Sequence, residues 1–131
     1  MLERIWKARR DERGFTLIEL IMVLVILGIL LALALPSYLG TRKKAYLAEA
    51  DQNLQEMRTQ AWLFYVEKQT FRNFPGTPAT SPSWTYNYGT GNDTQITMTA
   101  NARRVGPLSG TEVVTLTLSS DGTASVSSSG F

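Results

Sequence analysis

The first third of the chain carries a long apolar run with a single ionisable side chain. Residues 15–41 read FTLIELIMVLVILGILLALALPSYLGT, and Glu19 is the only acid or base among them. The 22 uncharged residues from 20 to 41 suffice for a helix that crosses about 30 Å of hydrocarbon. We therefore predict a transmembrane helix over residues 15–41.

Beyond residue 41 the apolar positions become periodic, as in an amphipathic helix. They recur at steps of three or four and so share one helical face; they are Leu47, Ala50, Leu54, Met57, Ala61 and Phe64. We expect this face to make core contacts rather than to bind a ligand. Together with the apolar run, the pattern predicts one helix over residues 15 to about 70, whose second half packs on a sheet.

The rest of the chain predicts a loop followed by short strands. Residues 71–83 hold three prolines and form the loop. Four later runs either are aromatic or alternate apolar with polar side chains, as strands do; they are residues 84–88, 95–100, 112–119 and 124–127. Asp121-Gly122 is a hairpin-turn signal between the last two. The predicted fold class is α+β, a long N-terminal helix packed on a C-terminal antiparallel sheet of about four strands.

The net charge of the chain resides in its first residues. The whole chain carries +2, and residues 1–14 hold five basic and three acidic side chains, so the remainder, with eight of each, is neutral. Five Lys/Arg precede the apolar run and three (42–44) follow it, which predicts a cytoplasmic N-terminus and an extracytoplasmic domain at 42–131. A secretory signal peptide is the alternative, but its apolar region is usually only ~7–15 residues long and is followed by a cleavage site of small residues and then by polar mature sequence.

Glu19 is costly within an apolar helix. A carboxylate costs about 2.5–3.5 kcal/mol at mid-membrane on insertion scales, and less near the interface. Either Glu19 lies near the membrane surface or it has a cationic partner, and no other side chain of the run supplies one. The nearest candidate cation is the α-amino group that a cut just before Phe15 would create.

The stretch Gly14-Phe15-Thr16-Leu17-Ile18-Glu19 follows a short charged leader and precedes an apolar helix with Gly28 and Pro36. This order of features resembles the N-terminal signature of type IV pilins and of the pseudopilins of type II secretion. The resemblance implies that a prepilin peptidase removes residues 1–14 by cutting between Gly14 and Phe15, and N-methylates Phe15. It also implies that Glu19 pairs with the terminal amine of a neighbouring subunit during assembly. Pairing within one chain stays open, because amine and carboxylate are only about one helical turn apart.

The resemblance further implies that the helix weakens between Gly28 and Pro36 inside the fibre. Proline lacks an N–H and crowds the carbonyl four residues back, and glycine costs about 1 kcal/mol in a helix relative to alanine. Close helix packing in a membrane is the alternative role for Gly28.

Other chemistry has little support in the sequence. The chain has no His and no Cys, which removes the commonest general base, thiolate ligands and disulfides. We expect no enzymatic activity, no cofactor and no metal, since Asp93 and Asp121 stand apart from other oxygen ligands that calcium would need. Arg103 and Arg104 are a weak candidate for contact with nucleic-acid phosphates, because most such pairs are simply solvated.

The resemblance implies a structural subunit of a type IV pilus that supports adhesion, twitching motility or DNA uptake. Its expected partners are identical or homologous subunits, the prepilin peptidase, an inner-membrane assembly platform and, without direct support, DNA. We expect a single-pass inner-membrane protein before assembly and an extracellular fibre afterwards. Two alternatives remain: a type II secretion pseudopilin, and a membrane anchor that presents a small binding domain without polymerising.

Overall fold

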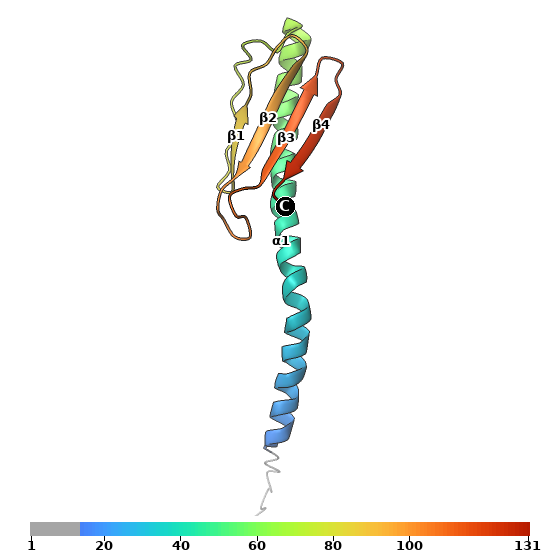
Figure 1. The fold of residues 1–131 in the computed structure, drawn as a ribbon, viewed down its shortest axis with the longest axis vertical. Helices are drawn as coiled ribbons and strands as arrows, with labels where there is room; N and C mark the ends of the chain where they lie inside the picture. The colour runs from blue at the N-terminus through green and yellow to red at the C-terminus, as the bar shows by residue number, and fades with distance from the viewer. Residues whose placement is uncertain (1–13) are drawn as a thin grey trace, which may run out of the picture. The chain divides into compact units, whose positions relative to one another are not determined.

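The computed structural model describes residues 14–131, which form one long helix and one four-stranded sheet (Figure 1). The elements are α1 (Leu17–Lys68), β1 (Trp84–Tyr88), β2 (Gln95–Ala102), β3 (Val113–Ser119) and β4 (Ala124–Ser129). The chain divides into two compact units between Pro36 and Ser37, and α1 contributes to both. The predicted α+β class is confirmed.

In the first unit, α1 has no covered face. Its large hydrophobic side chains from Leu17 to Leu35 are between 45% and 77% exposed. The most apolar 18-residue window of α1 has a mean hydropathy of 3.0, and none of it is buried. By length and composition α1 therefore includes a candidate membrane span. The helix continues through Pro36.

In the second unit, α1 buries the face that its periodicity predicts. Ala50, Leu54, Met57 and Ala61 are fully buried. Leu47, at one end of this face, packs against the core, whereas Phe64 at the other end is half-buried and contacts Phe74 edge-on, with ring centroids 5.2 Å apart.

α1 ends at Lys68, two residues before the predicted position. Gln69 takes a left-handed conformation (φ 55°), and its N–H donates to the Tyr65 carbonyl at 2.7 Å. This is the geometry of a helix C-cap, although glycine or asparagine is the usual residue there. The chain then turns so that Phe71 is buried in the core.

The sheet is antiparallel with the strands in chain order, β1-β2-β3-β4. The four predicted strands are confirmed, with β2 and β4 each two residues longer than expected and β3 beginning one residue later. The predicted turn is also confirmed, since Gly122 has φ 85° and its N–H donates to the Ser119 carbonyl at 3.0 Å.

The core lies between α1 and one face of β1, β2 and β3. Alternate side chains of these strands are buried against the helix: Trp84, Tyr86, Ile96, Met98, Ala100, Val114, Leu116 and Leu118. β4 differs, because all six of its residues are exposed. Val126 lies opposite the buried Leu116 yet remains 48% exposed, so β4 contributes backbone pairing but almost no side chain to the core.

Candidate functional site

The predicted cleavage position lies in the short segment before α1. Gly14, Phe15 and Thr16 have no regular secondary structure and are exposed. Apart from its neighbours in the chain, no described residue would lie within 4 Å of a Cβ added to Gly14. The rest of the predicted leader, residues 1–13, lies outside the described residues, and cleavage stays a prediction.

Thr16 and Glu19 form a capping box at the start of α1. The Thr16 hydroxyl oxygen accepts a hydrogen bond from the Glu19 N–H at 3.3 Å. The Glu19 Oε2 atom accepts in return from the Thr16 N–H at 2.9 Å and from the Thr16 hydroxyl at 2.8 Å. A Thr-x-x-Glu sequence satisfies free amide donors at a helix start in this reciprocal way.

The capping box gives Glu19 a partner that the sequence analysis missed, although the spacing of Thr16 and Glu19 is its ordinary signal. No ion pair to Glu19 is present within residues 14–131. In the uncut chain two hydrogen bonds from Thr16 thus offset part of the cost of the carboxylate. The salt bridge to a terminal amine remains a prediction about the processed protein.

Gly28 and Pro36 both lie inside α1. Apart from the helix's own backbone, no described atom lies within 4 Å of a Cβ added at Gly28, so a neighbouring helix is free to approach its backbone closely. The predicted loss of helix between these residues concerns the fibre, and it stays a prediction.

An ion pair joins α1 to the start of β3. The Lys43 Nζ atom lies 3.1 Å from Glu112 Oε1, and the Glu112 side chain is fully buried whereas that of Lys43 is 30% exposed. The Glu112 carboxylate also accepts from the Ser109 N–H at 3.0 and 3.1 Å and from the Gly110 N–H at 3.0 Å. The buried charge is therefore both paired and hydrogen-bonded, as a buried carboxylate must be.

These contacts set the pKa of Glu112. Burial raises the pKa, but hydrogen bonds from Ser109, from the backbone of Glu112 itself and from Lys43 outweigh burial, so that the pKa falls from 4.5 to about 2. The carboxyl group is consequently ionised throughout the physiological pH range. Sequence reasoning did not single out this pair, because nothing local relates the two residues.

Lys43 also contacts residues near the end of β4. Its Nζ atom donates to the Gly130 carbonyl at 3.3 Å and lies 5.5 Å from the ring centroid of Phe131. The Phe131 ring stacks on Trp84 at 6.3 Å, and the Trp84 indole N–H donates to the Tyr46 carbonyl at 3.1 Å. One lysine thus ties together α1, the loop before β3 and the segment after β4.

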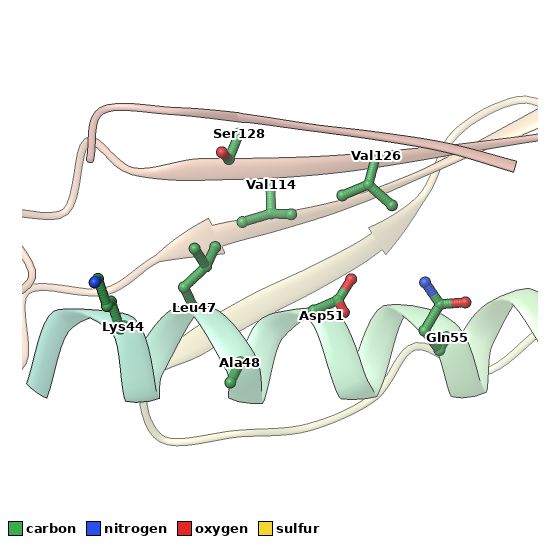
Figure 2. A pocket seen from close by; sticks show the side chains of 8 residues that line it. All are labelled: Lys44, Leu47, Ala48, Asp51, Gln55, Val114, Val126 and Ser128. Carbon is green, nitrogen blue, oxygen red and sulfur yellow. The ribbon is translucent and has the colours of Figure 1, made fainter. Parts of the chain in front are cut away.

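A groove separates α1 from the uncovered strand β4 (Figure 2). Its volume is about 560 Å³, and its lining residues are Lys44, Leu47, Ala48, Asp51, Gln55, Val114, Val126 and Ser128. Figure 2 shows Leu47 pointing from the helix toward Val114, while Val126 points from β4 toward the helix. Leu47, Val114 and Val126 give the groove an apolar wall, Asp51 lies between Leu47 and Gln55 along the helix, and Lys44 lies at one end.

Arg103 and Arg104 are exposed but engaged by their own surroundings. The Arg103 Nε–H donates to the Thr85 hydroxyl at 3.0 Å, and the Arg104 Nε–H donates to the Ser109 carbonyl at 3.3 Å. Trp84 and Tyr86 are buried on the core face of β1 and cannot stack with bases beside these arginines. Nucleic-acid contact stays an untested prediction.

The two isolated aspartates have local partners. Asp93 pairs with Arg72 at 2.7 Å and accepts from the Thr70 hydroxyl at 2.9 Å. Asp121 accepts from the N–H and hydroxyl of Thr123 within the β3–β4 turn. Within residues 14–131 no group of three acidic side chains is arranged to hold a metal ion.

The N-terminal region matches a known family model. Residues 9–35 match the model described as the prokaryotic N-terminal methylation motif. The match contains the predicted cleavage position, the Thr16–Glu19 capping box and most of the apolar part of α1.

Similar proteins extend the match into the sheet domain. The chain is 34% identical over 86 residues to the type IV major pilin protein PilA of Myxococcus xanthus, which covers 66% of this chain and 39% of that protein. It is 32% identical over 97 residues to the type IV narrow pilus major component PilA5 of Thermus thermophilus, and the match covers 69% of this chain and 79% of that protein. It is 32% identical over 62 residues to the type II secretion system core protein G of Dickeya chrysanthemi, and the match covers 47% of this chain and 40% of that protein. The chain thus spans less than half of the first and third proteins and most of the second.

Proposed function

The chain belongs to the type IV pilin and pseudopilin family, and from this premise we propose that it is a structural subunit of a type IV pilus. The observation that carries the proposal is the bare apolar surface of α1 in its first unit. Apolar patches of this size are rare on soluble monomers and mark surfaces that a membrane or a protein partner covers. A bilayer covers this surface before assembly, and the helices of neighbouring copies cover it afterwards.

The proposed assembly begins with a cut between Gly14 and Phe15 by a prepilin peptidase, followed by N-methylation of Phe15. The new ammonium group lies next to Thr16, within about one helical turn of Glu19. In the low dielectric of a fibre core an unpaired carboxylate is costly, so a charge partner on a neighbouring copy fixes the register of addition. An inner-membrane assembly platform is the expected partner for this step.

Before assembly we place the first unit of α1 across the inner membrane, with the N-terminus in the cytoplasm. The bias of five basic residues before the apolar run against three after it supports this orientation. Reporter fusions check it: alkaline phosphatase is expected to be active when fused after residue 131 and inactive when fused after a truncation within residues 1–14. The reverse result would overturn the orientation.

The type II secretion pseudopilin is the second candidate, because several similar proteins are named core protein G. The long shared coverage with a narrow pilus component favours the pilus. A non-polymerising anchor is the third candidate, and it assigns no role to Glu19. Adhesion, twitching motility and DNA uptake are the proposed roles of the pilus.

Mass spectrometry of fibres sheared from the cell surface tests the proposal. We expect this polypeptide in the fibres, beginning at a methylated Phe15, and a strong loss of fibres in Glu19→Gln. Glu67→Gln is the matched control, since Glu67 is an exposed glutamate of the same helix whose ion-pair partner among the described residues is Lys68. Absence of the chain from surface fibres together with its presence in a secretion complex would favour the pseudopilin, and unchanged behaviour of Glu19→Gln would favour the anchor.

A further inference from the structure

Three consecutive cations, Arg42, Lys43 and Lys44, follow the apolar run, and the structure divides them into two kinds. Lys43 is turned to the sheet, where Glu112 and the Gly130 carbonyl bind its ammonium group. Successive helical residues are about 100° apart, so Arg42 and Lys44 flank Lys43 on either side. Both are exposed.

Among residues 14–131, neither flanking cation has an acidic partner. Within the part of the chain that the structure describes, no carboxylate forms an ion pair with Arg42 or Lys44. The Arg42 guanidinium lies 5.9 Å from the ring centroid of Tyr38, one turn earlier on the helix. Tyr38 itself is 60% exposed, which leaves an aromatic ring and a cation side by side and open to the surroundings.

The position of these residues along the chain indicates what surrounds them. Residues 20–41 carry no Asp, Glu, Lys, Arg or His, so Arg42 and Lys44 are the first charged side chains after the apolar run that no described carboxylate pairs with. Tyrosine is enriched at the level of lipid headgroups. In the proposed orientation residues 42–44 lie at the outward-facing leaflet, and basic residues there attract whatever anionic lipid this leaflet carries by the same Coulomb force that acts at the cytoplasmic one. Arginine binds phosphate oxygens in a bidentate way, and lysine binds them as a point charge.

We propose that Arg42 and Lys44, with Tyr38, bind the phosphate groups of anionic phospholipids while the chain is in the membrane. Lys43 takes no part, because Glu112 already holds it. Arg103 and Arg104 take no part either, because they donate to Thr85 and Ser109 within the sheet domain. The proposal rests on the membrane stage of the proposed function and extends it to a lipid preference.

Residue-resolved NMR of the full chain in phosphatidylcholine bicelles, titrated with phosphatidylglycerol, tests the proposal. We expect saturable shifts at the Arg42 Nε–H and at the amides of residues 38–44. Either Arg42→Gln or Lys44→Gln is expected to raise the phosphatidylglycerol fraction at half-saturation on the order of fivefold, from about 1 kcal/mol per basic residue. The double change Arg103→Gln/Arg104→Gln is expected to leave it unchanged.

Three results would overturn the proposal. Shifts at residues 38–44 no larger than those at 103–104 would mean that no lipid site exists. If the control change at Arg103 and Arg104 weakens phosphatidylglycerol binding as much as Arg42→Gln does, the binding depends on net charge alone and not on a site at Arg42 and Lys44. Displacement of the lipid by inorganic phosphate, but not by chloride at equal ionic strength, would identify a site for free phosphate. The titration needs no fibre, so a negative titration would not contradict the proposal that the chain is a pilus subunit. Absence of the chain from surface fibres would likewise not contradict the proposed lipid site.

Discussion

The ammonium group of Lys43 lies 3.1 Å from the fully buried carboxylate of Glu112, and this pair joins α1 to the start of β3. Loss of one partner from a buried pair leaves an uncompensated charge and costs about 3–5 kcal/mol. We expect Lys43→Met to lower the free energy of unfolding by about that amount, measured by urea denaturation in detergent and followed by near-UV circular dichroism.

The double change Lys43→Met/Glu112→Gln is expected to cost less than the sum of the two single changes, because it removes both charges. Lys68→Met is the control, since it breaks the exposed pair with Glu67 and should leave stability unchanged. Strict additivity of the two single changes would contradict the assigned coupling.

The same carboxylate predicts an acid dependence of stability. The pKa of Glu112 is lowered from 4.5 to about 2, so its contribution is complete above pH 4.5 and is lost as the pH falls toward 2. Wild-type stability should therefore decline across this window more steeply than that of Glu112→Gln. The measurement is the urea midpoint of each protein as a function of pH. If the two midpoints fall in parallel, the pKa of Glu112 is not lowered in the folded protein, which would contradict the prediction.

Leu54 and Leu63 are leucines of the same helix in opposite environments, fully buried and 64% exposed respectively. Removing a buried leucine side chain costs about 2–5 kcal/mol, through lost transfer energy and the cavity that remains. We expect this loss for Leu54→Ala and less than about 0.5 kcal/mol for Leu63→Ala. Similar losses at both positions would mean that another surface covers Leu63 under the conditions of the measurement.

Gly122 turns the β3–β4 hairpin with φ 85°, and a Cβ there would lie 3.3 Å from the Trp62 ring. A side chain in the left-handed region costs about 1–2 kcal/mol, and we expect Gly122→Ala to destabilise the sheet domain by at least that amount in thermal unfolding. Gly40→Ala is the comparison, because Gly40 is helical with open space around it. It is expected to stabilise α1, by about 0.5–1 kcal/mol.

The capping box predicts a role for the Thr16 hydroxyl in defining the start of α1. Thr16→Val removes the acceptor for the Glu19 N–H and one donor to its carboxylate. We expect faster hydrogen exchange of the first amides of α1 in detergent micelles, whereas Thr16→Ser, which keeps the hydroxyl, should exchange as the wild type does. Equal exchange in both variants would assign the start of the helix to other contacts.

Most secondary structure was predictable because it depends on local patterns. The steps of three and four from Leu47 to Ala61 define a helix face wherever they occur, and alternation at Gln95–Ala102 defines a strand in the same way. The left-handed Gln69 was not predictable, since glutamine rarely adopts that conformation. The helix therefore ends at Lys68, two residues before the predicted position.

Contacts between distant segments were beyond sequence reasoning. Lys43 is one of three adjacent cations, and no local feature marks it as the one that binds Glu112. Alternation along β4 likewise does not reveal that α1 leaves Val126 uncovered. The N-terminal motif led to the correct family, yet the capping role of Glu19 was visible in the spacing to Thr16 and was overlooked in favour of a charge partner.

The exposure of β4 on both faces has a consequence for how freely the protein can change. Because its six side chains contribute almost nothing to the core of the described chain, changing them removes little packing within it. Single substitutions at the exposed serines of this strand are therefore expected to change stability by less than about 0.5 kcal/mol. Since the chain has no cysteine, a single thiol placed at Ser127 would be the only one in the molecule, and a dye attached there is expected to leave the core packing of the described chain unchanged.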